Sequence, residues 1–234
     1  MKVLVTGVKG QLGFDVVNEL EKRGHTAIGT ENIAKVCKEI NAKLMYISTD
    51  YVFNGEGERP WQPDDTVTIP LNEYGYSKYL GEQAVQKYVK DFYIVRIAWV
   101  FGINGKNFVK TMLNVGKNHD TVRVVNDQIG TPTYTFDLAR LLVDMIETDK
   151  YGIYHGTNEG GYISWYDFTC EIYRQAGYTT NVVPVTTEEY GLSKAKRPKN
   201  SRLDKSKLVD NGFKPLPDWK DALARYIEIL NKEN

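Results

Sequence analysis

Apolar residues recur along this chain at two spacings, and each spacing predicts one type of secondary structure. A spacing of three to four residues predicts helices at residues 12–23 and 32–40, and further helices are predicted at residues 74–89, 108–116 and 136–146, the last of them strongly amphipathic. Short apolar runs without polar alternation predict buried strands at residues 2–6, 44–47, 92–98 and 122–125. Strands that alternate with helices in this way are typical of an α/β fold with a Rossmann-type, doubly wound parallel sheet.

The chain changes character after Tyr151, where aromatic residues become frequent among polar segments. Further helices are predicted at residues 164–175 and 219–230, on either side of a loop that contains Arg197. We therefore expect a dinucleotide-binding domain at residues 1–150 and, at residues 151–234, a smaller C-terminal α/β lobe that mainly binds substrate. Such a lobe would close over the carboxyl edge of the sheet, where folds of this class bind their ligands.

One junction near residue 30 departs from the expected order of elements. A dinucleotide-binding fold carries an acidic residue about 20 positions after its glycine turn, at the end of the second strand. Glu31 has that spacing, but residues 27–33 have the pattern of a helix entry. Because each βα unit takes roughly 30 residues, we hypothesise that on the order of fifty residues are absent between about His25 and Thr30. An intact mass of 26.7 kDa for the natural protein would refute this hypothesis.

Composition narrows the classes of partner. Thirty basic side chains balance thirty acidic ones, so no overall field attracts the protein to nucleic acid or to an anionic membrane. No apolar run approaches the roughly 20 residues that cross a bilayer, and the first apolar run is too short for a secretory signal. Cys37 and Cys170 lack metal-binding or redox spacing, which favours two buried thiols in a reducing cytoplasm.

A glycine turn joins the first predicted strand to the first predicted helix. Residues 7–13 read GVKGQLG, and glycine at these positions lets the backbone turn tightly beside a pyrophosphate. The N–H groups at the start of the helix would then face the phosphates. An ordinary strand-to-helix turn is the alternative. The pattern predicts a dinucleotide site at Gly7, Gly10, Gln11, Leu12 and Gly13.

Tyr74 and Lys78 stand four residues apart on a predicted helix and therefore share one face. A free phenol titrates at about pH 10, and a neighbouring cation lowers that pKa. Tyr74 is thus a candidate acid for a carbonyl oxygen, with Lys78 beside it as a ligand of a cofactor ribose. Thr49 ends a predicted strand, where it would polarise the same carbonyl, cap the following turn, or do both. A surface pair of tyrosine and lysine is the alternative.

Four further segments, taken with these motifs, resemble one enzyme family. They read STDYVFNG at residues 48–55, RIAWVFG at 96–102, DQIGTPT at 127–133 and RPKNSRLD at 197–204. Together with the glycine turn and the Tyr–Lys pair, they resemble the extended short-chain dehydrogenases and, among these, the dTDP-4-dehydrorhamnose reductases. The Tyr–Lys pair is common to the superfamily, whereas the last two segments are more specific to this branch. The resemblance covers nearly the whole chain apart from the junction near residue 30.

The resemblance implies a cytoplasmic enzyme that uses NADPH, or alternatively NADH, to reduce the 4-keto group of dTDP-4-dehydro-L-rhamnose. It implies that Thr49, Tyr74 and Lys78 are catalytic and that Ser48 lies at the cofactor. Tyr51 and Trp99 would contact the apolar face of the sugar, or else pack in the core. The residues expected around the diphosphate or the sugar are Asn107, Gln128, Thr131 and Arg197. Arg197 has Lys194 and Lys196 beside it and would contact a phosphate, or else belong to a solvated basic turn. A homodimer is left open, and the sequence offers no evident set of metal ligands.

Two other functions remain open from the sequence. A related nucleotide-sugar epimerase or dehydratase returns the hydride to its own substrate. A dehydratase would carry a second carboxylate at the position of Tyr51, directly after Asp50. A non-catalytic subunit that binds a dinucleotide and a partner enzyme would not need the intact set of Thr49, Tyr74 and Lys78. Net oxidation of the cofactor by a keto sugar separates these functions.

Overall fold

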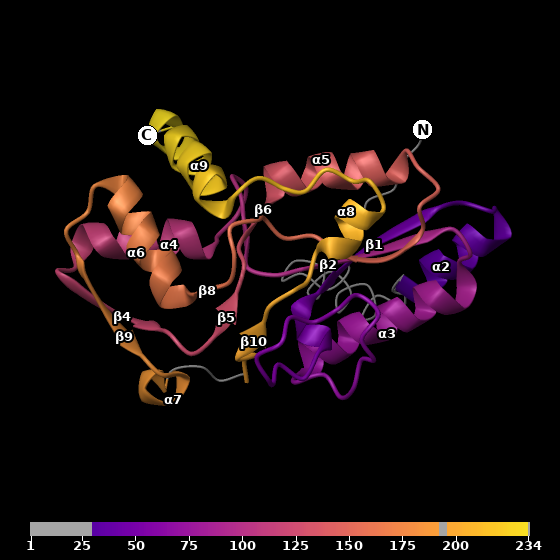
Figure 1. Cartoon of the computed structure of the whole chain (residues 1–234), viewed down its shortest axis with the longest axis horizontal. Coiled ribbons are helices and arrows are strands. Elements are labelled where there is room, and N and C mark those ends of the chain that lie inside the picture. Colours follow the sequence, from indigo (N-terminus) through magenta and orange to yellow (C-terminus); the bar gives the residue numbers. More distant parts are fainter. Residues whose placement is uncertain (1–29, 192–195, 234) are drawn as a thin grey trace, which may run out of the picture.

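A computed structural model describes residues 30–191 and 196–233 and contains a parallel β-sheet with helices on both faces (Figure 1). Among the residues that it describes, no helix is long and apolar enough to cross a membrane. The predicted strand at residues 2–6, the glycine turn with Gly7, Gly10, Gln11, Leu12 and Gly13, and Lys194 lie outside the described residues.

The central sheet has the order β1-β2-β7, with all three strands parallel. Its strands are β1 (Leu44–Thr49), β2 (Phe92–Ile97) and β7 (Gly152–His155). The interior of β2 is buried without alternation, as expected for a strand covered on both faces. Thr49 is in register with Ile97, so β1 and β2 end at the same edge of the sheet. The predicted parallel sheet of an α/β fold is confirmed.

Helices cover the two faces of this sheet. On one face, α3 packs against β1 and carries α2 on its flank, and on the other face α5 lies across β2 (Figure 1). Leu138, Leu141 and Met145 of α5 are buried against Tyr93 and Val95 of β2. These helices are α2 (Thr30–Glu39), α3 (Glu73–Tyr88) and α5 (Thr135–Ile146), close to their predicted bounds.

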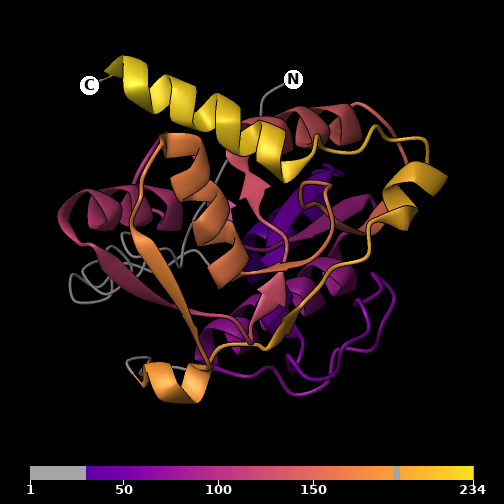
Figure 2. The same cartoon turned by 60° about the vertical axis from the view of Figure 1, so that its left-hand side comes forward.

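A second lobe is built around the parallel pair of β4 and β9. Its helices α4 and α6 pack against each other, and α9 lies across α6 (Figure 2). Phe101, Phe168, Trp219 and Tyr226 are buried in the core of this lobe. Its elements are α4 (Phe108–Asn118), β4 (Thr121–Val125), α6 (Trp165–Ala176), β9 (Asn181–Val185), α7 (Thr187–Tyr190) and α9 (Trp219–Glu233).

Short strands join the two lobes. β3 pairs with β6, and β5 pairs with both β8 and β10. β10 belongs to a strap, residues 196–205, that runs along the long loop, residues 50–72. Trp61 and Arg202 join the two segments through a backbone hydrogen bond of 2.9 Å. The remaining elements are η1 (Asp50–Val52), β3 (Val100–Phe101), β5 (Ile129–Gly130), β6 (Thr133–Tyr134), β8 (Ile163–Ser164), β10 (Asn200–Ser201) and α8 (Ser206–Asp210).

Strand pairing crosses residue 150 in both directions. β7 follows residue 150 but extends the central sheet, whereas β4 precedes it but pairs with β9 in the second lobe. The division into residues 1–150 and 151–234 stays a prediction. A division based on strand pairing would assign β7 to the first domain and β4 to the second.

Glu31 lies in the first turn of α2, as the helix-entry pattern near residue 30 indicates. Its carboxylate forms an ion pair of 3.0 Å with Lys35 and accepts a hydrogen bond of 3.0 Å from the Tyr88 hydroxyl. Glu31 is therefore not at the end of a strand. The hypothesis that a segment is absent before it stays untested, because residues 25–29 lie outside the described residues.

Candidate active site

Thr49 ends β1 and begins η1 at the carboxyl edge of the sheet. Its hydroxyl accepts a hydrogen bond of 3.3 Å from the backbone N–H of Tyr51 and donates one of 3.0 Å to Asp50 Oδ1. The capping role considered for Thr49 is therefore confirmed. Its role at a substrate carbonyl stays a prediction that this position allows.

Tyr74, in the first turn of α3, lies beside Thr49 and Tyr51. The Thr49 hydroxyl lies near enough to the phenol to lower its pKa, and the rings of Tyr51 and Tyr74 meet edge to face with centroids 5.6 Å apart. Gly75 makes this approach feasible, because a Cβ atom there would lie 2.1 Å from the Tyr51 carbonyl oxygen. The structure thus brings together three of the predicted residues from β1, the long loop and α3.

Lys78 lies one turn further along α3 and points toward β1. Its ammonium donates a hydrogen bond of 2.6 Å to the Ile47 carbonyl and lies 4.1 Å from the centroid of the Tyr46 ring. Burial lowers the pKa of Lys78 to about 8, although the negative charge of Glu82 opposes the shift. The ammonium is therefore still largely protonated at pH 7.

The expected lowering of the Tyr74 pKa by Lys78 is wrong for this arrangement. Burial raises the pKa of Tyr74, the hydrogen bond with Thr49 lowers it, and the charge of Asp50 raises it. The physical reason is that the Lys78 ammonium binds a carbonyl of β1, while the charge that shifts the Tyr74 pKa is that of the Asp50 carboxylate.

Trp99 follows β2 and lies between the lobes. Its backbone has a φ of 50°, a left-handed conformation that is uncommon for a bulky residue. The indole stacks on Trp165 of α6, with centroids 3.7 Å apart and planes 15° apart. Backbone strain of this kind is often kept where a side chain has to point in a functional direction. Trp165 did not emerge from the sequence, where it was one of several aromatic residues after Tyr151.

Three residues expected at the substrate use their side chains in bonds within the protein. Asn107 caps α4 by accepting a hydrogen bond of 3.0 Å from the Lys110 N–H. Gln128 donates one of 3.0 Å to the Thr187 hydroxyl, and Thr131 donates one of 3.0 Å to a backbone carbonyl. Their substrate contacts stay predictions, since these bonds already explain why polar side chains lie there.

Arg197 is exposed on the strap, and its positive charge lowers the pKa of Tyr51 against the raising effects of burial and of Asp50. Next to it, Pro198 packs so closely on Gly55 that a Cβ atom on this glycine would lie 2.5 Å from the proline Cβ. The backbone of Lys196 accepts a hydrogen bond of 3.0 Å from Asn72. The strap therefore places a cation near the Tyr51 phenol.

Asp50 and Ser201 were missed as site residues. The Asp50 carboxylate accepts hydrogen bonds from the hydroxyls of Thr49 and Ser201, and all three side chains are at most 5% exposed. Burial raises the pKa of Asp50 to about 6, and the two hydroxyl groups oppose that rise. Asp50 stands beside Thr49 in the sequence, but no spacing indicates that Ser201 reaches it.

Ser48 and Lys78 have the chemistry that a dinucleotide needs at this edge. The Ser48 hydroxyl is buried at the end of β1 and has no hydrogen-bond partner among the described residues. A buried polar atom without a partner is costly unless a ligand satisfies it. Lys78 adds an ammonium that donates to a carbonyl of the same strand. The residues present therefore fit a ribose with its hydroxyl groups.

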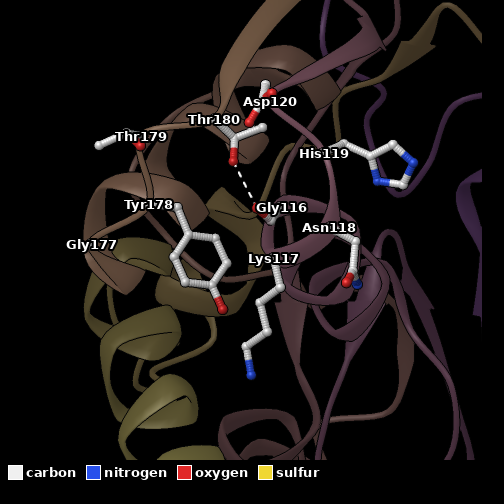
Figure 3. A pocket seen from close by; sticks show the side chains of 9 residues that line it. All are labelled: Gly116, Lys117, Asn118, His119, Asp120, Gly177, Tyr178, Thr179 and Thr180. Carbon is white, nitrogen blue, oxygen red and sulfur yellow. Dashed lines mark hydrogen bonds between the residues drawn. The ribbon is translucent and has the colours of Figure 1, made fainter.

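Two surface cavities, of about 440 and 580 Å³, lie away from these residues. The first lies between the end of α4 and the turn before β9, with Lys117, His119 and Tyr178 around it (Figure 3). The second lies between the long loop and α3. Neither is lined by a residue predicted for the chemistry.

A parallel sheet with threonine, tyrosine and lysine at its carboxyl edge is the arrangement of a short-chain dehydrogenase. Residues 26–232 match the family model described as the RmlD substrate binding domain. The chain belongs to this family, that of the dTDP-4-dehydrorhamnose reductases.

Relatives and solved structures agree with this assignment. The chain is 40% identical over 226 residues to the spore coat polysaccharide biosynthesis protein SpsK of Bacillus subtilis, covering 94% of this chain and 78% of that protein. It is 38% identical over 217 residues to dTDP-4-dehydrorhamnose reductase of Escherichia coli, covering 87% and 71%. The Bacillus anthracis dTDP-4-dehydrorhamnose reductase, solved in complex with NADP, superposes with a TM-score of 0.81 at 41% identity, covering 90% of this chain and 75% of that one.

Proposed function

We propose that this protein reduces the 4-keto group of dTDP-4-dehydro-L-rhamnose with NADPH, which yields dTDP-L-rhamnose. The observation that carries the proposal is the cluster of Thr49, Tyr51 and Tyr74 at the end of β1, with Lys78 one turn away on α3. The names of the relatives support the substrate, and NADP in the Bacillus anthracis structure supports NADPH over NADH. A cytoplasmic location, a homodimer and the lack of nucleic-acid binding stay predictions.

Each side chain of the cluster has a role in this reaction. NADPH supplies the hydride. The Tyr74 phenol donates the proton to the oxygen of the former carbonyl, and the Thr49 hydroxyl donates a hydrogen bond to the same oxygen. Lys78 and Ser48 hold the ribose of the cofactor. Tyr51 and Trp99 face the sugar. Arg197 binds the diphosphate, because a guanidinium donates paired hydrogen bonds to a phosphate.

The direct test is NADPH oxidation by the keto sugar. We expect one NADPH to be oxidised for each dTDP-4-dehydro-L-rhamnose consumed, with NADH as the slower donor, and dTDP-L-rhamnose to be recovered by chromatography. The product itself, which has no keto group, is the control and should leave NADPH unchanged. A cofactor that recycles without net oxidation would establish an epimerase or dehydratase instead, and binding of a partner enzyme without any turnover would establish a regulatory subunit.

Gly130 offers a second test, because it borders the indole of Trp99. A Cβ atom at this position would lie 3.0 Å from Trp99 Cε2 and 3.0 Å from Ser201 Cβ. We expect Gly130→Ala to cost about 1–3 kcal/mol of unfolding free energy through overpacking. We also expect it to raise KM for the keto sugar by about 10-fold, the equivalent of about 1.4 kcal/mol.

The Gly130→Ala prediction is checked by denaturant unfolding and by steady-state kinetics. Gly105→Ala is the control, because a Cβ atom there would meet no atom within 4 Å, although its φ of 75° adds some backbone strain. It should therefore lower stability without changing KM. An unchanged KM in Gly130→Ala would remove Trp99 from the sugar contact.

A further inference from the structure

Asp50 is a buried carboxylate for which the proposed reaction has no use. It is 2% exposed, and its two oxygens accept hydrogen bonds from hydroxyl groups on two different elements. Thr49 at the end of β1 donates to Oδ1 at 3.0 Å, and Ser201 of β10 donates to Oδ2. Asp50 thus joins the central sheet to the strap through the hydroxyl that the reaction needs.

The bond with Asp50 occupies the Thr49 hydroxyl as a donor. A hydroxyl has one hydrogen and two lone pairs. Thr49 gives the hydrogen to Asp50, and its oxygen accepts from the Tyr51 N–H at 3.3 Å. In this arrangement Thr49 is not able to donate to a substrate carbonyl as well. Its hydrogen has to leave Asp50 before it reaches the substrate.

We propose that Asp50 is a positioning residue that sets the direction of the Thr49 hydroxyl hydrogen. As a carboxylate, Asp50 holds this hydrogen away from the substrate carbonyl. As a neutral acid, it donates its own proton to Thr49 Oγ1, and the hydrogen of Thr49 turns to the carbonyl. The proton comes from solvent when substrate binds and returns to solvent when product leaves, so the balance of the reaction is unchanged. This inference rests on the proposed function.

The surroundings of Asp50 favour such a change of protonation near neutral pH. Burial raises the pKa of Asp50 to about 6. Among the described residues, its charge raises the pKa values of the Tyr51 and Tyr74 phenols. Arg197 lies beyond, where it lowers the pKa of Tyr51. The donation from Thr49 lowers the pKa of Asp50, so a substrate that takes this hydrogen raises it further.

The test compares kcat/KM of the native enzyme and of Asp50→Asn from pH 5.5 to pH 8.5. The asparagine amide donates to Thr49 at every pH and still accepts from Ser201. A group with a pKa of about 6 is half protonated at pH 6 and about one hundredth protonated at pH 8, and kcat/KM reports the free enzyme. We expect the ratio of variant to native kcat/KM to rise at least about 10-fold between pH 6 and pH 8.

Ser201→Ala is the second variant, and it keeps the acid at position 50. Because the Ser201 hydroxyl lowers the pKa of Asp50, its loss raises that pKa. The fall in kcat/KM should therefore move to higher pH, a shift that a purely structural contact would not produce. If Asp50→Asn fails to fold, the shift of the kcat/KM pH profile in Ser201→Ala alone decides whether Asp50 has this role.

The outcomes separate the two proposals. Suppose that the native enzyme reduces the keto sugar. If the ratio of Asp50→Asn to native kcat/KM then stays flat with pH, the role of Asp50 is wrong and the proposed function stands. The same holds if Ser201→Ala moves the pH profile of kcat/KM to lower pH or leaves it unchanged. If the native enzyme fails to oxidise NADPH with the keto sugar, both proposals are wrong. A rising ratio together with an upward displacement in Ser201→Ala supports the role of Asp50.

Discussion

Tyr74→Phe is expected to lower kcat for reduction of the keto sugar by at least about 100-fold, the usual contribution of a general acid. The variant keeps the aromatic ring that meets Tyr51 edge to face, and it removes only the hydroxyl group beside Thr49. The expected loss therefore falls on proton donation rather than on packing. Steady-state kinetics with saturating NADPH measures it, and KM should change far less than kcat.

Tyr76→Phe is the matched control for this variant. Tyr76 lies on the same helix, and its exposed fraction of 49% is nearly that of Tyr74, at 48%. Loss of its hydroxyl should change kcat by no more than about 2-fold, as for most surface substitutions. Equal losses in the two variants would point to damage to α3, and near-normal activity in Tyr74→Phe would exclude its phenol as the acid.

The long elements of the fold were predictable because their patterns are local. β1 and β2 are apolar runs long enough to be recognised, and the helix between them, α3, begins at a side-chain cap. Asn72, for example, accepts a hydrogen bond of 2.9 Å from the Gly75 N–H at the start of α3. A local cap marks the start of this helix, so its predicted bounds were close to those observed.

The connections between the lobes were not predictable, because distant contacts make them. β5 and β10 have two residues each, and their pairing joins segments about 70 positions apart. β9 contains Pro184, a residue that argues against a strand unless it lies at an edge. Sequence order also drew the domain division at residue 150, whereas strand pairing places β7 in the central sheet and β4 in the second lobe.

The site was predictable as a set of residues but not as an arrangement of charges. Spacing on one helix placed Tyr74 and Lys78 on a common face, yet it gave no information on where the ammonium points. That depends on the Ile47 carbonyl and the Tyr46 ring, both on a different element. In the same way, Asp50 accepts a hydrogen bond from the hydroxyl of Ser201, which lies 151 positions away in the sequence.

A buried ion pair fixes the long loop that carries Tyr51 and Asp50 to the sheet. Arg96 of β2 donates to both carboxylate oxygens of Glu82 on α3, at 2.9 and 2.7 Å, and both side chains are at most 2% exposed. The Nη1 group of Arg96 donates a hydrogen bond of 3.1 Å to the Pro63 carbonyl of the long loop. The Arg96 guanidinium also lies 4.9 Å from the centroid of the Phe53 ring.

Arg96→Leu is therefore expected to lower the free energy of unfolding by about 3–5 kcal/mol, because it leaves the Glu82 carboxylate buried without its partner. The double variant with Glu82→Leu should recover a large part of that loss, since an apolar pair removes the unpaired charge. Lys232→Ala breaks an exposed pair with the same 2.7 Å separation and should cost no more than about 0.5 kcal/mol. Denaturant unfolding measures all three. A double variant as unstable as the sum of its single variants would show that the charges are solvated rather than buried, and the long loop would then need another anchor.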